Sequence, residues 1–216
     1  MKAKKPRRAS FFWSLALILF FPCFSFAQTI WVFPRFAIDG DTLFLSNGLK
    51  LRLKSIDAPE LGHGKGKDQY FAREAKYFLF KLVKGKKLKL EEVEKDRFGR
   101  IIAQVYTADG NWINREMLAQ GFAFYFEHKG VFYPRLLKAQ QEAMRLRKGF
   151  WAKLLELPLA RRSYLGNSYS RRFHQLSCPN GQLISSRHKR LFFSLYEAFY
   201  KGYAPARGCT PWPLVD

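Results

Sequence analysis

Acidic residues are scarce in this chain of 216 residues: Asp and Glu number 17 against 38 Lys and Arg, a net charge of +21. Solubility alone needs far less charge, so we expect a polyanionic partner such as nucleic acid, an anionic membrane surface or an acidic polysaccharide. Low-complexity sequence is absent too, because 48% of the residues are hydrophobic and 17% are aromatic. This composition excludes a disordered protein and allows one domain with a real core plus an appendage.

The apolar run from Phe11 to Phe24 is shorter than the roughly 20 residues that an ordinary membrane-spanning helix needs. Basic residues precede this run, and Ser25-Phe26-Ala27 follows it with small residues at the −3 and −1 positions of a cleavage site. This layout is typical of a secretory signal peptide. We therefore predict a signal peptide over residues 1–27, export to the periplasm or the medium, and no stable membrane association after cleavage. An uncleaved membrane anchor is the alternative.

Cysteine is rare, and Cys23 lies within the predicted signal peptide. The other two, Cys178 and Cys209, lie in the C-terminal part of the chain, which begins where the composition shifts near Leu157-Pro158. An even pair in an exported chain favours one disulfide, with a zinc site as the alternative. We predict a domain over residues 28–157 and a small basic module over 158–216.

Periodicity in residues 28–157 predicts a mainly β fold with helices. The expected strands are 30–38, 42–45, 50–56, 87–94 and 101–106, and the expected helices are 68–83, 114–120 and one that Pro134 opens and Gly149 follows. This order suits a small five-stranded barrel with three packed helices.

Three short stretches carry the candidate chemistry: Asp39-Gly40-Asp41-Thr42, Arg52 with Asp57-Ala58-Pro59-Glu60, and Asp96-Arg97-Phe98-Gly99-Arg100. Carboxylates with no His or Cys nearby favour Ca²⁺ or Mg²⁺ over Zn²⁺. Arginine guanidiniums suit phosphate oxygens. Each stretch alone is ordinary turn or surface-pair chemistry, but the three together indicate phosphodiester hydrolysis.

These stretches resemble the thermonucleases, the staphylococcal-nuclease-like family, over roughly residues 35–152. Further matches are Gln69 to Ala75, Asn114 to Ala123, and Glu142-Ala143 with Gly149-Phe150-Trp151. The resemblance implies an OB-fold barrel with three helices and Ca²⁺-dependent cleavage of DNA and RNA to 3′-phosphate products.

The resemblance also assigns roles to single residues. Asp41, Asp57 and the Ala58 carbonyl are implied as calcium ligands, with Asp39 as an outer carboxylate near the metal. Glu60 is implied as the general base, while Arg52 and Arg100 bind the phosphate. Arg97 and Phe98 are implied near the nucleotide. Phe98 stands where the family usually has Tyr, so stacking on a base is kept while a hydroxyl is lost. The assigned set is Asp39, Asp41, Arg52, Asp57, Ala58, Glu60, Arg97, Phe98 and Arg100.

The tail resembles a different, small Cys-containing module, the metal-binding domain of an alkylation-repair protein. The matching residues include Phe173-His174, Cys178, Gly202-Tyr203-Ala204-Pro205 and Cys209, but Ala206 stands where a further Cys belongs. Three possible ligands remain, whereas a structural zinc site normally has four. We therefore predict a Cys178–Cys209 disulfide.

These observations predict an exported, calcium-dependent, sugar-non-specific nuclease. We expect it to be monomeric and to prefer single-stranded DNA or RNA, because stacking needs an exposed base. The main alternative is an OB-fold module that binds nucleic acid without cutting it. A cationic protein that acts on membranes or cell-wall polymers is a second alternative.

Overall fold

The computed structural model describes residues 29–62, 64, 66–127, 131, 133–209 and 212–213. The predicted signal peptide, residues 1–27, lies outside the described residues. Within the described part of the chain, no helix has both the length and the apolar character needed to cross a membrane.

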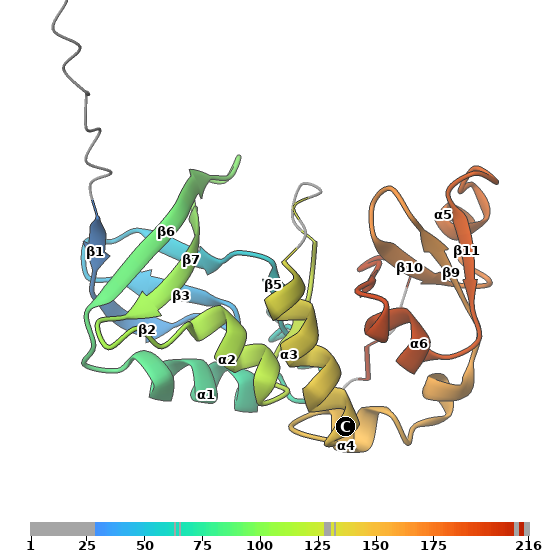
Figure 1. The fold of residues 1–216 in the computed structure, drawn as a ribbon, viewed down its shortest axis with the longest axis horizontal. Coiled ribbons are helices and arrows are strands. Elements are labelled where there is room, and N and C mark those ends of the chain that lie inside the picture. Colours follow the sequence, from blue (N-terminus) through green and yellow to red (C-terminus); the bar gives the residue numbers. More distant parts are fainter. Residues whose placement is uncertain are drawn as a thin grey trace, which may run out of the picture.

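A curled sheet forms the first part of the molecule (Figure 1). Its strands follow the order β1-β6-β7-β4-β3-β2. Their bounds are β1 (Ile30–Val32), β2 (Pro34–Ala37), β3 (Thr42–Leu45), β4 (Lys50–Leu53), β6 (Leu88–Lys95) and β7 (Ile101–Thr107). Beside them lies a short ladder of β5 (Ile56–Asp57) and β8 (Phe124–Tyr125). The predicted class, a mainly β barrel with packed helices, is confirmed.

The sheet has six strands where five were predicted, because the expected strand 30–38 divides at Phe33. The part before Phe33 pairs with β6, and the part after it pairs with β3. One residue therefore joins the two edge strands of the sheet. Edges that are one residue apart must lie close in space, so the sheet curls on itself as a barrel does.

Three helices pack against this barrel, namely α1 (Ala72–Val83), α2 (Ile113–Ala119) and α3 (Pro134–Arg145). In α1 the buried residues recur at helical spacing, from Ala75 to Leu79 to Val83. The predicted helix from Asp68 begins four residues later, since Phe71 adopts a left-handed conformation with φ 73°. The barrel interior is aliphatic and centres on buried leucine, isoleucine and valine residues.

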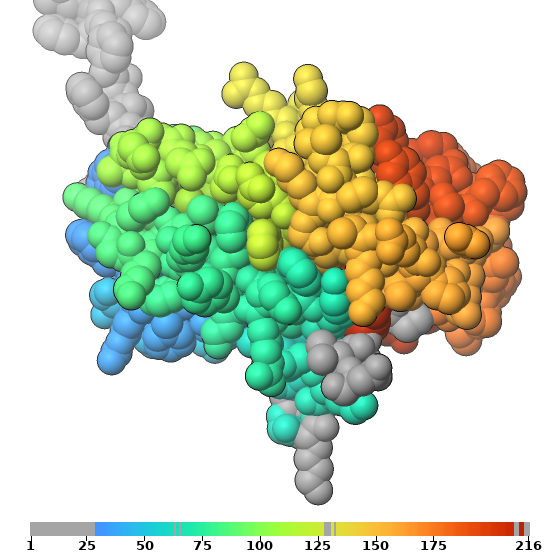
Figure 2. Space-filling model, turned by 90° about the horizontal axis from the view of Figure 1, so that it is seen from below, coloured from blue at the N-terminus to red at the C-terminus, as the bar shows by residue number. Residues whose placement is uncertain are grey.

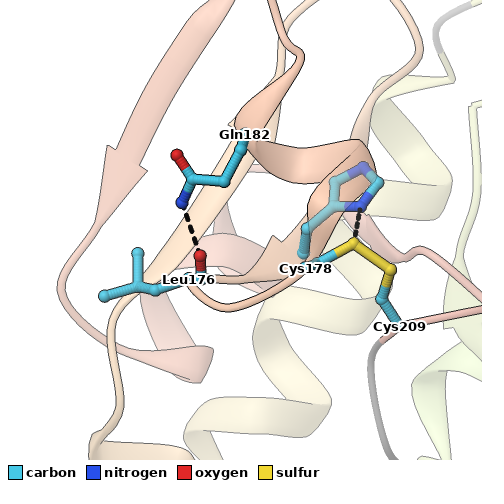
Figure 3. The surroundings of a disulfide bond; sticks show 5 residues. Leu176, Cys178, Gln182 and Cys209 are labelled. Carbon is cyan, nitrogen blue, oxygen red and sulfur yellow. Dashed lines mark hydrogen bonds between the residues drawn. A yellow bond between two sulfur atoms is a disulfide. The ribbon is translucent and has the colours of Figure 1, made fainter.

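The C-terminal module, which we define as the residues from Pro158 onward, follows the short helix α4 (Trp151–Leu154). Its elements are η1 (Pro158–Arg161), β9 (Tyr164–Asn167), β10 (Arg172–Gln175), α5 (Pro179–Gln182), β11 (Lys189–Phe192), α6 (Leu195–Tyr200) and β12 (Ala204–Pro205). The strands form a sheet in the order β11-β9-β10-β12. A disulfide joins Cys178, before α5, to Cys209, after β12 (Figure 3). These two sulfur atoms are bonded to each other and so are not free to ligate zinc.

The C-terminal module lies beside α3, which its helix α6 contacts (Figure 1), and the surfaces of the two regions are continuous in Figure 2. One aromatic cluster spans both regions. Phe150 and Trp151 come from the α3–α4 region, and Phe199 and Trp212 come from the module. Their rings meet edge to face, with Trp151 and Phe199 centroids 4.9 Å apart and those of Phe150 and Trp212 5.2 Å apart.

A buried amide reinforces this junction. The Gln140 side chain accepts a hydrogen bond from the Tyr125 backbone N–H at 2.6 Å and donates one to the Phe199 carbonyl at 2.7 Å. Trp212 Nε1 donates to the Tyr70 carbonyl at 2.9 Å. The module is therefore fixed to the barrel by both apolar packing and satisfied buried polar groups.

Candidate active site

The turn between β2 and β3 places Asp41 at the start of β3. Asp39 Oδ1 accepts the Asp41 backbone N–H at 2.9 Å, which shapes the turn. A Cβ on Gly40 would lie 2.7 Å from the Cβ atoms of both Ala58 and Ala75. Only glycine allows the turn to approach this closely, so Asp41 is pressed against the segment that carries Asp57, and it is 2% exposed.

Arg52 joins the two buried aspartates. It lies on β4, directly across from Thr42 in the ladder with β3. Its Nη1 is 2.5 Å from Asp41 Oδ1, and its Nη2 is 2.9 Å from Asp57 Oδ1. The Asp41 carboxylate also accepts hydrogen bonds from the Thr42 hydroxyl at 2.8 Å and the Ala58 N–H at 3.1 Å. The Asp41 carboxylate is therefore bonded to Thr42, Arg52 and Ala58, and Arg52 links it to Asp57 in one bonded unit.

Glu60 is held at the rim of this unit by Gln69. The Glu60 backbone N–H donates to Gln69 Oε1 at 2.8 Å, and the Gln69 N–H donates to the Glu60 carbonyl at 2.9 Å. Two reciprocal hydrogen bonds fix the backbone of Glu60 without using its carboxylate. Gln69 is thus a positioning residue for Glu60.

The C-terminal module adds two arginines that sequence reasoning did not assign to the site. Arg207 Nη2 is 2.6 Å from Asp57 Oδ1 and 2.7 Å from Glu60 Oε1. Arg172 Nη1 is 3.6 Å from Asp57 Oδ2. Asp57 therefore faces guanidinium groups from both regions of the protein.

The turn between β6 and β7 forms the opposite side. Asp96 Oδ1 accepts the backbone N–H groups of Phe98 and Arg100, both at 2.9 Å, and its Oδ2 accepts Arg100 Nε at 2.7 Å. Phe98 is 69% exposed, and the Arg97 guanidinium lies 4.8 Å from the centre of its ring. Arg100 is thus tied to Asp96, whereas Arg52 is tied to the buried aspartates.

A cleft of about 540 Å³ separates these two sides. Its polar lining is strongly cationic, with seven basic and two acidic side chains. The charged lining residues are Arg52, Lys54, Asp57, Lys95, Asp96, Arg97, Arg100, Arg172 and Arg207. Phe98 and Phe126 supply aromatic surface. A basic cleft with aromatic faces is suited to binding nucleic acid.

The carboxylates differ in their electrostatics. Burial raises the pKa of Asp41 well above its usual value, and neighbouring carboxylates raise it further although Arg52 lowers it. Burial also raises the pKa of Asp57, but three neighbouring guanidiniums outweigh burial and hold the pKa below its usual value. Burial raises the pKa of Glu60 despite Arg207. A carboxylate with a raised pKa is a better acceptor for a proton from water.

Asp41 and Asp57 fit a calcium ion by donor type and charge. Both offer hard oxygens, and each carries one negative charge when ionised. Among the described residues, three side chains of ligating type gather within 4.8 Å only in the group His174, Cys178 and Cys209. In the candidate site, guanidinium groups lie between the carboxylates. Arg52 bridges Asp41 and Asp57, and Arg207 bridges Asp57 and Glu60.

The sequence of the barrel region matches a known family. The staphylococcal nuclease homologue family matches residues 50–153 of the chain. An uncharacterized endonuclease of Escherichia coli is 34% identical over 124 residues, which cover 56% of this chain and 76% of that protein. The chain belongs to the staphylococcal nuclease family.

Two other relatives in this family share a similar stretch. An uncharacterized endonuclease of Haemophilus influenzae is 40% identical over 53% of this chain and 62% of its own length. A probable staphylococcal-like nuclease of rice (Oryza sativa subsp. japonica) is 37% identical over 50% of this chain. The chain spans only 30% of the rice protein.

The match to the staphylococcal nuclease family does not extend over the whole site. The matched range contains Arg52, Glu60 and Arg100, while Asp41 precedes it and Arg207 follows it. No local sequence signal marks Arg172 or Arg207, because each reaches the site only through the folding of the C-terminal module. Gln69 was noted only as part of the family resemblance.

Proposed function

We propose that this protein is a calcium-dependent endonuclease that hydrolyses phosphodiester bonds of DNA and RNA to 3′-phosphate products. The observation that carries the proposal is the bonded unit of Asp41, Arg52 and Asp57, whose Arg52 and Asp57 line a cationic cleft, with Glu60 joined to Asp57 through Arg207. Membership of the staphylococcal nuclease family supports it.

In this proposal each residue has a distinct task. Arg52 and Arg100 bind the non-bridging phosphate oxygens and stabilise the charge that develops on them. Glu60 takes a proton from the attacking water, and Gln69 keeps it in position. Asp41 and Asp57 would hold a calcium ion, which polarises a phosphoryl oxygen when bound. Water attacks phosphorus, the bond to the 5′ oxygen breaks, and this oxygen takes up a proton and leaves as the 5′ hydroxyl.

We further propose that the substrate is single-stranded. Phe98 is exposed at the cleft and offers a face for one base, and Arg97 lies beside it. A base in a duplex does not expose this face. Lysines and arginines on the cleft wall would bind the backbone, so affinity should fall with salt.

We also retain the proposal that the chain is exported and acts as a monomer in the periplasm or the medium. The basic and apolar segment at residues 1–27 supports export. Sequencing the N-terminus of the secreted protein tests it, and a start at Gln28 is the expected result.

Cleavage of single-stranded DNA by the chain from Gln28 onward, with Ca²⁺ or with chelator, tests the activity. Glu60→Gln and Arg100→Ala should each lower kcat by about 10²-fold or more. Glu74→Gln and Arg187→Ala make the same changes on exposed residues outside the cleft and should cut normally. Cutting that persists in chelator or in both site variants would contradict the proposal. Binding without any cutting by the unaltered protein would favour the non-catalytic OB-fold module.

A further inference from the structure

Two arginines of the C-terminal module enter the cleft that the barrel forms. We propose that Arg207, supported by Arg172, is a phosphate-binding residue of the active site, so that the module completes the nucleic-acid cleft. This inference rests on the proposed nuclease function and adds a substrate contact from outside the range that matches the family.

Arg207 lines the cleft beside Asp57 and Glu60. Its Nη2 lies 2.6 Å from Asp57 Oδ1 and 2.7 Å from Glu60 Oε1. Its side chain is 58% exposed, so the guanidinium keeps further N–H donors for an anion. Arginine presents five such donors in a planar fork that matches phosphate oxygens.

The backbone around Arg207 is anchored on both sides. Before it, β12 pairs with β10, and the Ala206 N–H donates to the Phe173 carbonyl at 2.8 Å. After it, Cys209 is bonded to Cys178 (Figure 3), and Trp212 packs on Phe150. A side chain held in this way is preorganised for binding, which reduces the entropy lost when substrate arrives.

Arg172 supports this position. Its guanidinium lies 3.8 Å from the centre of the Phe126 ring, and Nη1 donates to the Pro205 carbonyl at 3.0 Å. It therefore holds the end of β12, two residues before Arg207. Its charge also faces Asp57, which already contacts Arg52 and Arg207.

The charge balance of the cleft favours an anionic ligand over a purely structural ion-pair network. Basic side chains outnumber acidic ones by seven to two in its lining. Two of the seven, Arg172 and Arg207, come from the module. One carboxylate, Asp57, lies among the guanidiniums of Arg52, Arg172 and Arg207. Positive charge therefore remains in excess there, and a phosphodiester backbone would neutralise it.

The test measures binding apart from turnover. A fluorescein-labelled oligodeoxythymidylate is titrated with the chain from Gln28 onward in chelator, over a series of salt concentrations, and followed by anisotropy. Arg207→Ala should weaken binding about tenfold and make the slope of log affinity against log salt shallower by about 0.7, the value for one lost phosphate contact on a single strand. With Ca²⁺, KM should rise. Arg207→Lys should recover part of the affinity.

Arg187→Ala, which removes the same charge from an exposed site of the same module, is the matched control and should leave the slope unchanged. Equal thermal midpoints would show that the variants are folded. The inference would be overturned if Arg207→Ala left both the affinity and the slope of log affinity against log salt unaltered. Faster cutting by this variant would also overturn it, because Arg207 would then inhibit the reaction. The two hypotheses can fail separately. If the proposed nuclease function is wrong, the unaltered protein will not cut DNA. The binding titrations still test the role of Arg207, because they do not depend on cutting.

Discussion

The two walls of the cleft are built in opposite ways. The wall at residues 96–100 is a turn whose Asp96 accepts three hydrogen bonds from residues at most four positions away. The other wall carries Arg207, whose partner Asp57 is 150 positions away in the sequence. The first wall forms wherever β6 and β7 pair. The part of the second wall that Arg172 and Arg207 supply exists only while the module is docked on the rest of the protein. Substitutions far from the cleft that weaken this docking should therefore also weaken that wall.

Removing the C-terminal module should have the largest effect on the difference between the two walls, because it removes Arg172 and Arg207 and also destabilises the barrel region. Truncation after Leu157 would expose Phe150 and Trp151, both fully buried now, along with Phe124. Burying a large apolar side chain contributes about 1.5–3 kcal/mol, so several kcal/mol would be lost from a total stability of about 5–15 kcal/mol. We expect aggregation or a large fall in urea midpoint, measured by tryptophan fluorescence. A truncated chain as stable as the full one would show that the barrel does not need the module.

Opening the disulfide should have a smaller effect on the same wall. The Cys178–Cys209 bridge spans 31 positions, and a crosslink of that size stabilises by about 2–4 kcal/mol. Cys178→Ala with Cys209→Ala should lower the free energy of unfolding by that amount, which lowers the urea midpoint. It should also weaken oligonucleotide binding, because Arg207 lies two residues from Cys209.

Reductant supplies the control for this prediction. It should shift the urea midpoint of the unaltered protein to that of the double variant, and it should leave the double variant unchanged. Binding that is insensitive to reductant would mean that β12 pairing and Trp212 are sufficient to hold Arg207.

The smallest effect is expected at the local wall. Hydrogen bonds from Arg100 and Phe98 outweigh burial and lower the pKa of Asp96 below its ordinary value of 3.8. The ionised form therefore stabilises the fold above pH 3.8, and this contribution is lost as pH falls through the lower folded-state pKa. Asp96→Asn should cost about 1 kcal/mol at pH 7.

Urea unfolding from pH 7 downward checks the sign at Asp96. The difference in free energy of unfolding between the Asp96→Asn variant and the unaltered protein should stay constant down to about pH 5 and become smaller below about pH 4. A difference that grows on acidification would contradict the assignment.

The sequence predicts what local chemistry determines. The barrel class, the helices α1 to α3 and the three motif stretches follow from periodicity and turn residues. The division at Phe33 could not be predicted, because 30–38 reads as one apolar segment and only pairing with two different strands separates its halves. Arg172 and Arg207 were missed for a related reason. Their place in the cleft depends on the packing of Trp212 and on the β10–β12 ladder, which no local pattern encodes.

The hydrogen bonds of Gln140 determine which substitutions the junction between the barrel and the module tolerates. Both of its partners are main-chain atoms, the Tyr125 N–H and the Phe199 carbonyl. The hydrogen bonds of this amide therefore do not constrain the side chains at positions 125 and 199, since the amide contacts only their backbone. The amide itself has no equivalent, because Glu lacks its donor and Leu lacks both groups. Across variants of this protein, the aromatic cluster should drift in composition while this single position stays glutamine.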